Sequence, residues 1–218
     1  MRVTDIEVAS ETLADPSADV WSSIEPVELD LQPTPSEYLV TKYAKVAWRD
    51  RKWGLIDRVT LQAARAHGNL FVRISWRDRS HPEAEFPDAC ALAFPLEGDA
   101  PLETFGSREK PLAMWYWRSD LPRQAEDAIA RSMRDITRKE QQSVSAASIF
   151  ETNGNSSDNS GIWHVVFWRT LAAPSGSEPS VDLEPGKNVP FVVLVWEGAN
   201  EERAGLASMT PAWQQLEL

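Results

Sequence analysis

Hydrophobic and polar positions alternate with a period of two in several separate segments of this chain, as they do in half-buried β-strands. Residues 24–31 (IEPVELDL) follow this pattern. Residues 60–66 and 70–76 follow it less strictly, and they flank the short stretch His-Gly-Asn, which is typical of a hairpin turn. The pattern predicts a strand at 24–31 and a hairpin over 60–76.

Further strands are predicted at residues 88–95, 112–117, 161–171 and 189–196. The last of them, VPFVVLVW, is apolar throughout, which is typical of a central strand that is buried on both faces. Many short strands separated by turn signals favour a sandwich of two sheets. We therefore expect a mainly β fold, a single β-sandwich with long loops.

One segment has a helical pattern instead. Residues 122–142 begin with a proline, which is tolerated in the first turn of a helix, and carry an apolar stripe with charges elsewhere. The stripe consists of Ala125, Ile129, Met133 and Ile136. The spacing predicts one amphipathic helix, inserted around residues 122–142 and lying on the sandwich.

The domain organisation follows from the distribution of these elements. Residues 1–20 are expected to form an N-terminal extension, and residues 21–218 a single sandwich domain. Two polar stretches, 152–161 and 173–186, predict long loops. No internal repeat divides the chain.

Composition supports a globular fold and excludes several classes of function. The 218 residues are 42% hydrophobic and include 10 Trp, enough for a Trp-rich core. The net charge of −11 disfavours nucleic acid as a partner. The single cysteine, Cys90, excludes an intramolecular disulfide and any Cys-based zinc or iron–sulfur site, and we expect it to be a buried, inert thiol.

The sequence also bears on membranes and location. No run of 18 or more apolar residues is present, so no membrane span is predicted. The first residues lack the basic and apolar regions of a secretory signal. This favours a cytoplasmic location, with the periplasm open if an exported partner carries the chain.

Five stretches of the chain, taken in order, resemble a known family. They are LFVRISWRD (70–78), PDACALAFP (87–95), PLAMWYWRSD (111–120), GIWHVVFWRTL (161–171) and PFVVLVWEGANEERAG (190–205). Their order and spacing resemble the gamma subunit of type II DMSO-reductase-family molybdoenzymes. Members serve ethylbenzene dehydrogenase, dimethylsulfide dehydrogenase, chlorate reductase and selenate reductase. The resemblance runs from about Trp21 to the C-terminus.

The resemblance implies an accessory electron-transfer subunit without a catalytic site of its own. Gamma subunits of this family are β-sandwiches that hold one haem b. They sit beside an iron–sulfur beta subunit, which contacts a catalytic alpha subunit with a molybdenum bis-pterin cofactor. The gamma haem passes electrons between the iron–sulfur chain and an external carrier. The alpha subunit selects the substrate.

The chain departs from the family at both axial haem ligands, which are usually a Met and a Lys. The family's Met position corresponds to Phe105, before Gly106, and its Lys position to Ala207. Neither side chain has a donor atom for iron. Replacement ligands would come from Met114, Met209 or His164, although a Met among aromatic residues more often fills a core and a His on a strand is more often packed.

Three functions therefore stay open. The first is a haem b subunit with replaced ligands. The second is a haem-less structural subunit of the same type of complex, in which side chains such as Phe105 fill the cavity. The third is a free-standing ligand-binding β-sandwich, for example a carbohydrate-binding module. The acidic run Glu197, Glu201 and Glu202 is expected to be a solvated loop.

Overall fold

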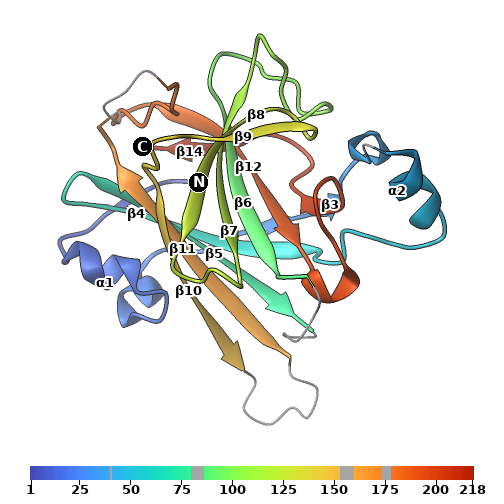
Figure 1. The fold of residues 1–218 in the computed structure, drawn as a ribbon. Helices are drawn as coiled ribbons and strands as arrows, with labels where there is room; N and C mark the ends of the chain where they lie inside the picture. Colours follow the sequence, from blue (N-terminus) through green and yellow to red (C-terminus); the bar gives the residue numbers. More distant parts are fainter. Residues whose placement is uncertain (40, 80–85, 153–159, 173–177) are drawn as a thin grey trace.

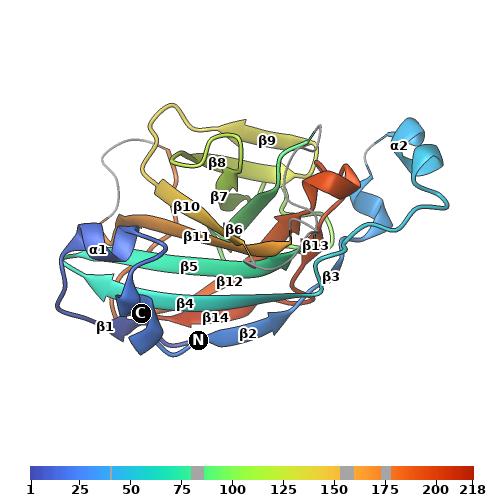
Figure 2. The ribbon, with the colours of Figure 1, turned by 90° about the horizontal axis from the view of Figure 1, so that it is seen from below.

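Two β-sheets pack face to face in the computed structural model, which describes residues 1–39, 41–79, 86–152, 160–172 and 178–218 (Figures 1 and 2). Within these residues the smaller sheet has the order β1-β4-β5-β11-β10, with β2 also paired to β4. The larger sheet has the order β3-β13-β12-β6-β7-β8-β9, with β14 also paired to β12. The predicted β-sandwich is confirmed.

The strands of the smaller sheet are β1 (Thr4–Asp5), β2 (Val27–Asp30), β4 (Arg58–Ala66), β5 (Asn69–Asp78), β10 (Ser145–Thr152) and β11 (Gly161–Thr170). Those of the larger sheet are β3 (Gln32–Pro33), β6 (Ala89–Pro95), β7 (Leu112–Arg118), β8 (Ala125–Ser132), β9 (Asp135–Arg138), β12 (Asn188–Trp196), β13 (Ser208–Met209) and β14 (Gln214–Glu217). The helical segments are α1 (Ser10–Ala14), η1 (Asp19–Ser23), η2 (Ser36–Tyr38), α2 (Lys42–Ala47) and η3 (Gly198–Asn200). None of these helical segments could cross a membrane.

The predicted hairpin over 60–76 is present as β4 and β5, which pair from Thr60–Ser75 to Ala66–Asn69. His67 and Gly68 form its two-residue turn, with φ angles of 47° and 73°. Two successive positive φ angles give the turn the twist that matches antiparallel strands. The apolar run 189–196 is the central strand β12, with β6 on one side and β13 and β14 on the other.

The space between the sheets holds a Trp-rich core. The rings of Trp76, Trp117 and Trp163 lie with centroids 5.1 to 6.3 Å apart. Trp76 and Trp163 come from the smaller sheet and Trp117 from the larger, so the three rings join the two layers. Cys90 is buried in the same core, and burial raises the pKa of its thiol, as expected for an inert cysteine.

The predicted helix at 122–142 is wrong. Residues 125–138 form the hairpin β8–β9 instead, and β8 pairs with β7 from Leu112–Ala130 to Trp117–Ala125. Ala128 and Ala130 pack on the outer face of the sheet while Ala125 joins the inner core. Small side chains on both faces suit this strand, and alanine's helix propensity concealed the period of two.

The first 20 residues add strand β1 to the smaller sheet and then cover part of its outer face. Strand β1 pairs with β4 in parallel, and α1 buries Leu13 beside Trp21 and Phe71. The two termini lie close together (Figures 1 and 2). The amino group of Met1 donates a hydrogen bond to the Gln215 carbonyl oxygen, and the backbones of Arg2 and Glu217 form an isolated parallel β-bridge. Residues 153–159 and 173–177 of the predicted loops 152–161 and 173–186 lie outside the described residues.

Candidate functional site

A second hydrophobic cluster, here called the outer cluster, lies on the face of the larger sheet that points away from the smaller one. Its buried members are Tyr38, Ala89, Ala91, Ala93, Ala100, Phe105, Leu112, Met114, Ala128, Ala130, Met133, Val192, Leu194, Trp196, Ala207 and Met209. The fold therefore brings together both positions that the resemblance assigns to axial ligands, Phe105 and Ala207. It also brings two of the predicted replacement ligands, Met114 and Met209, into the same cluster.

The backbone aims Phe105 into the outer cluster. Phe105 has a φ of +57°, which is unfavourable for a residue with a Cβ, and its side chain is fully buried. Gly106 follows with a φ of +90°, and a Cβ there would lie 2.9 Å from the carbonyl oxygen of Ala130. The Phe105 ring packs edge-on against Tyr38, with the centroids 6.0 Å apart. The two successive positive φ angles therefore occur where the loop buries the Phe105 side chain.

Ala207, which is far from Phe105 along the chain, also belongs to the outer cluster. Thr34 donates a backbone hydrogen bond of 2.9 Å to its carbonyl oxygen and accepts one of 3.2 Å from its amide at Oγ1. The Thr34 hydroxyl also donates to the Gly205 carbonyl oxygen at 2.6 Å. Ala207 is completely buried, so its methyl group occupies the place where the resemblance would put a lysine.

Met114 and Met209 stand on the same face of the larger sheet. Met114 lies on β7 and Met209 on β13, with β6 and β12 between them. Three strand spacings and an offset of two residues along the strands separate them, roughly 16 Å between their backbones. Haem needs two ligands that face each other across the iron, whereas these thioethers rise side by side from one sheet over packed Val192, Leu194 and alanines. Met114 and Met209 are therefore not placed as an axial pair on two sides of a haem.

His164 is not part of this cluster. It lies on β11 of the smaller sheet, where its Nδ1 is 2.7 Å from the Ser75 hydroxyl and its Nε2 is 3.2 Å from Glu151. Burial and the neighbouring charge of Arg73 lower its pKa, and Glu151 acts in the opposite direction. Both ring nitrogens therefore have protein partners, and the structure separates His164 from Met114 and Met209.

A buried acidic cluster, which the sequence analysis missed, joins the ends of three strands. Asp78, Asp88 and Glu197 each place a carboxylate oxygen within 4.8 Å of the others. Asp88 accepts a hydrogen bond of 2.8 Å from the amide of Gly198, and Trp163 Nε1 lies 3.2 Å from both aspartates. The sequence does contain one indication of this cluster, because each of the three carboxylates lies at or directly beside the end of an apolar strand.

The expectation that Glu197, Glu201 and Glu202 form a solvated run is wrong for two of them. Glu197 and Glu202 are buried, and only Glu201 is exposed. Glu202 accepts hydrogen bonds from the amides of Gly54 and Glu197 at 2.8 and 3.1 Å. Backbone donors thus hold the Glu202 carboxylate, which sequence spacing could not reveal because Gly54 lies far away along the chain.

Asp88 gives a prediction for the pH dependence of stability. Burial, and next the charge of Asp78, raise its pKa from 3.8 to about 7. Between these two values the unfolded chain loses the proton first, so stability should fall as the pH rises from about 4 to about 7, by at most about 1.4 kcal/mol per unit. Asp88→Asn should flatten this slope in urea unfolding followed by Trp fluorescence. An unchanged slope in the variant would contradict the assignment.

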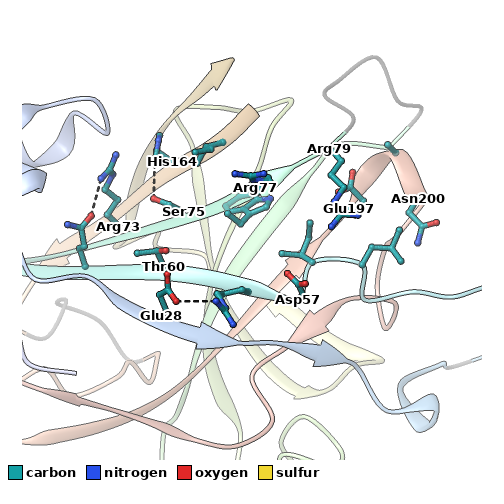
Figure 3. Close-up of a pocket in the computed structure, with 17 residues that line it drawn as sticks. Glu28, Asp57, Thr60, Arg73, Ser75, Arg77, Arg79, His164, Glu197 and Asn200 are labelled. Carbon is teal, nitrogen blue, oxygen red and sulfur yellow. Dashed lines mark hydrogen bonds and ion pairs between the residues drawn. The ribbon is translucent and has the colours of Figure 1, made fainter. Parts of the chain in front are cut away.

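An open groove of about 830 Å³, here called the arginine groove, crosses the outer face of the smaller sheet (Figure 3). Arg73, Ser75 and Arg77 alternate along β5, so all three point to this face, and Arg79 follows at the strand end. Its remaining lining consists of Glu28, Leu55, Ile56, Asp57, Arg58, Thr60, Gln62, Trp76, Ile162, His164, Glu197, Ala199 and Asn200.

The arginine side chains at the two ends of the arginine groove differ in their contacts with other residues. Arg73 donates to Gln62 at 3.0 Å, and its guanidinium lies 5.8 Å from the Trp21 ring. Burial lowers the pKa of Arg73. Arg77 and Arg79 are exposed on the other half of the groove (Figure 3). In the sequence, the alternation R-I-S-W-R (73–77) indicates a strand and also places two arginines on the same face, which the analysis of periodicity alone does not reveal.

Comparisons with known proteins confirm the resemblance. The chain is 27% identical over 218 residues to the gamma subunit of chlorate reductase from Ideonella dechloratans, covering 97% of this chain and 82% of that protein. It is 27% identical over 210 residues to a proposed haem subunit of a respiratory nitrate reductase from Haloferax mediterranei, covering 93% and 68%. No family model matches the chain.

Among solved structures, the chain superposes with a TM-score of 0.54 on a proposed carbohydrate-binding protein from Bacteroides uniformis. The two share 11% sequence identity over 99% of this chain and 97% of the other. At this identity the likeness extends to the sandwich fold and carries no information about a ligand.

Proposed function

We propose that this chain, a homologue of the gamma subunits of DMSO-reductase-family molybdoenzymes, is a non-catalytic accessory subunit that fills the family's haem site with its own side chains. Its partners are an iron–sulfur beta subunit and a molybdenum-containing alpha subunit, where catalysis takes place. The homology over nearly the whole chain supports the accessory role. The packing of the outer cluster supports the loss of haem.

One observation carries the haem-less form. Phe105 and Ala207, which replace the two axial ligands, are both fully buried in a single packed cluster. A large aromatic ring at the first position occupies volume, and a methyl group at the second removes the donor. Two positions without a donor atom, both packed in one buried cluster, are what a site converted to a structural core would require.

The accessory role then rests on shape rather than on redox chemistry. The Phe105 ring and the hydrogen bonds of Thr34 to Ala207 keep the loops over the larger sheet in place. A rigid sandwich can hold the neighbouring iron–sulfur subunit in position. Electrons would enter or leave the complex through that subunit or through another partner.

A haem b subunit with replaced ligands is the second candidate. Met114 and Met209 favour it, because thioethers can ligate haem iron and both lie in the outer cluster. Their placement on one face of one sheet is the reason for preferring the haem-less form.

The test is to purify the tagged chain with its partners from its native host. Molybdenum, iron and acid-labile sulfide should co-elute with the chain, and a pyridine haemochrome assay of the same sample should show no b-type haem. Stoichiometric haem that disappears in Met114→Leu or Met209→Leu would overturn the haem-less form. Recovery of the chain as a free monomer, with no molybdenum protein, would overturn the accessory role.

A further inference from the structure

Residues 41–58, here called the basic arm, have a charge opposite to that of the rest of the chain. They include six Lys or Arg residues and two Asp residues, a formal charge of +4 in a chain whose net charge is −11. Lys42, Lys45, Arg49 and Lys52 are exposed, and no ion pair to a carboxylate is found for them among the described residues. These four cations are therefore available to a charged partner.

The basic arm also carries exposed hydrophobic side chains. Tyr43, Val46 and Leu55 are 82%, 60% and 49% exposed, and they are the three most exposed large hydrophobic residues in the described part of the chain. Tyr43 and Val46 are three residues apart on α2, so they share one side of the helix. An aromatic and an aliphatic group surrounded by cations resemble the apolar centre and charged rim of a protein interface.

The base of the basic arm is anchored to the sandwich. Trp48 is buried with Leu39 and Leu206, and the Arg51 guanidinium stacks 4.1 Å from the Trp48 ring centroid. Arg51 also pairs with Glu201 at 2.9 Å. Helix α2 lies at the edge of the sandwich (Figures 1 and 2). Because the contacts of Trp48 and Arg51 fix the residues that follow α2, the exposed side chains of Tyr43 and Val46 are held in a defined position.

The basic arm continues into the arginine groove. Its last residues, 55–58, line one side of the groove, opposite Arg77 and Arg79 on the neighbouring strand end (Figure 3). The exposed cations of the arm and of the groove therefore belong to one connected face. The sequence places them in two separate segments, and the pairing of β4 with β5 joins them.

We infer that the basic arm and the arginine groove together form the docking surface for an acidic surface of a neighbouring subunit in the molybdenum complex. This inference rests on the proposed function. Unpaired cations would steer an acidic partner into place, and Tyr43, Val46 and Leu55 would supply the apolar contact. A protein partner fits better than a nucleic acid or an anionic membrane, because the chain's overall charge of −11 repels an extended polyanion.

Charge reversal tests the surface in the complex purified from the native host. Lys45→Glu combined with Arg49→Glu should lower the fraction of chain that co-elutes with the molybdenum subunit at least about tenfold at about 0.15 M ionic strength. The matched control is Arg134→Glu combined with Arg138→Glu, which makes the same charge change at exposed residues of the β8–β9 hairpin. The control should assemble like the wild type, and all variants should melt at the wild-type temperature.

A second measurement replaces Tyr43 with a photo-cross-linking amino acid, with Ile149, on the distant strand β10, as the control position. A cross-link from position 43 to an Asp- and Glu-rich surface of a complex subunit, mapped by mass spectrometry, is the expected result.

Assembly that is unaffected by the charge reversal, or a cross-link from position 43 to nucleic acid, lipid or a basic surface, would overturn the docking surface alone. Absence of any molybdenum protein from the wild-type preparation would overturn the proposed function and this inference together.

Discussion

Replacing Phe105 by alanine is expected to lower the free energy of unfolding by about 3–5 kcal/mol. Phe105 is fully buried in the outer cluster, so truncation leaves a cavity lined by Tyr38 and its neighbours in addition to losing apolar burial. The loop has little freedom to collapse, because Gly106 already packs so closely that an added Cβ would lie 2.9 Å from the Ala130 carbonyl oxygen. Urea unfolding should show a lower midpoint with an unchanged slope.

Phe105→Met is the matched control for this cavity. It keeps the positive φ and most of the side-chain volume, and it restores the residue type that the resemblance expects. Its cost should stay below about 1.5 kcal/mol. Equal destabilisation by Ala and Met would show that Phe105 does not fill the site, and the argument for a converted haem pocket would fail with it.

Replacing Asp127 by asparagine is expected to cost about 3–5 kcal/mol, the range for breaking a buried ion pair. The Asp127 carboxylate lies 2.9 Å from Lys139 Nζ, and both side chains are almost completely buried. The side chain also accepts a hydrogen bond of 2.5 Å from the Ser143 hydroxyl. Burial lowers the pKa of Arg169, and the charges of Asp127 and then Asp182 oppose that effect, so the Asp127 carboxylate also acts on a second buried cation.

Lys139→Met should cost less than Asp127→Asn, because Arg169 still compensates the remaining carboxylate. The double variant should be more stable than the sum of the two single effects implies, with a coupling of about 0.5–3 kcal/mol. Thermal and urea unfolding of the three variants measure this directly. Strict additivity would mean that Lys139 and Asp127 do not act as a pair.

This ion pair also explains why residues 122–142 were assigned to a helix from the sequence. The helical pattern placed Ala125, Ile129, Met133 and Ile136 on one stripe and left the charges, Asp127 among them, off it. In the fold, β8 is paired on both sides and Asp127 lies inside. A buried charge that is neutralised by a residue twelve positions away leaves no local signal, so the periodicity favoured the wrong element.

The sequence named only some of the residues of the candidate site. The resemblance assigned the axial-ligand positions to Phe105 and Ala207, and the chain itself offered Met114, Met209 and His164 as replacement ligands. Haem ligation by these three stays a prediction. Strand pairing places Met114 and Met209 on one face of the larger sheet and His164 on the other sheet, and loops bring Phe105 and Ala207 to the two methionines. The acidic cluster and the arginine groove were missed, because each combines residues from strands that are far apart in the sequence.

The sequence by itself determined the sandwich class, the β4–β5 hairpin, the central strand β12, the Trp-rich core and the family resemblance. These features depend on local periodicity, on turn residues and on the order of motifs along the chain, and all three can be recognised without knowing which strands pair. Only the tertiary structure decided that β8–β9 is a hairpin, that Glu197 and Glu202 are buried, and that the basic arm joins the arginine groove. The physical reason is that burial and charge compensation depend on which distant residues share a face, and strand pairing sets that.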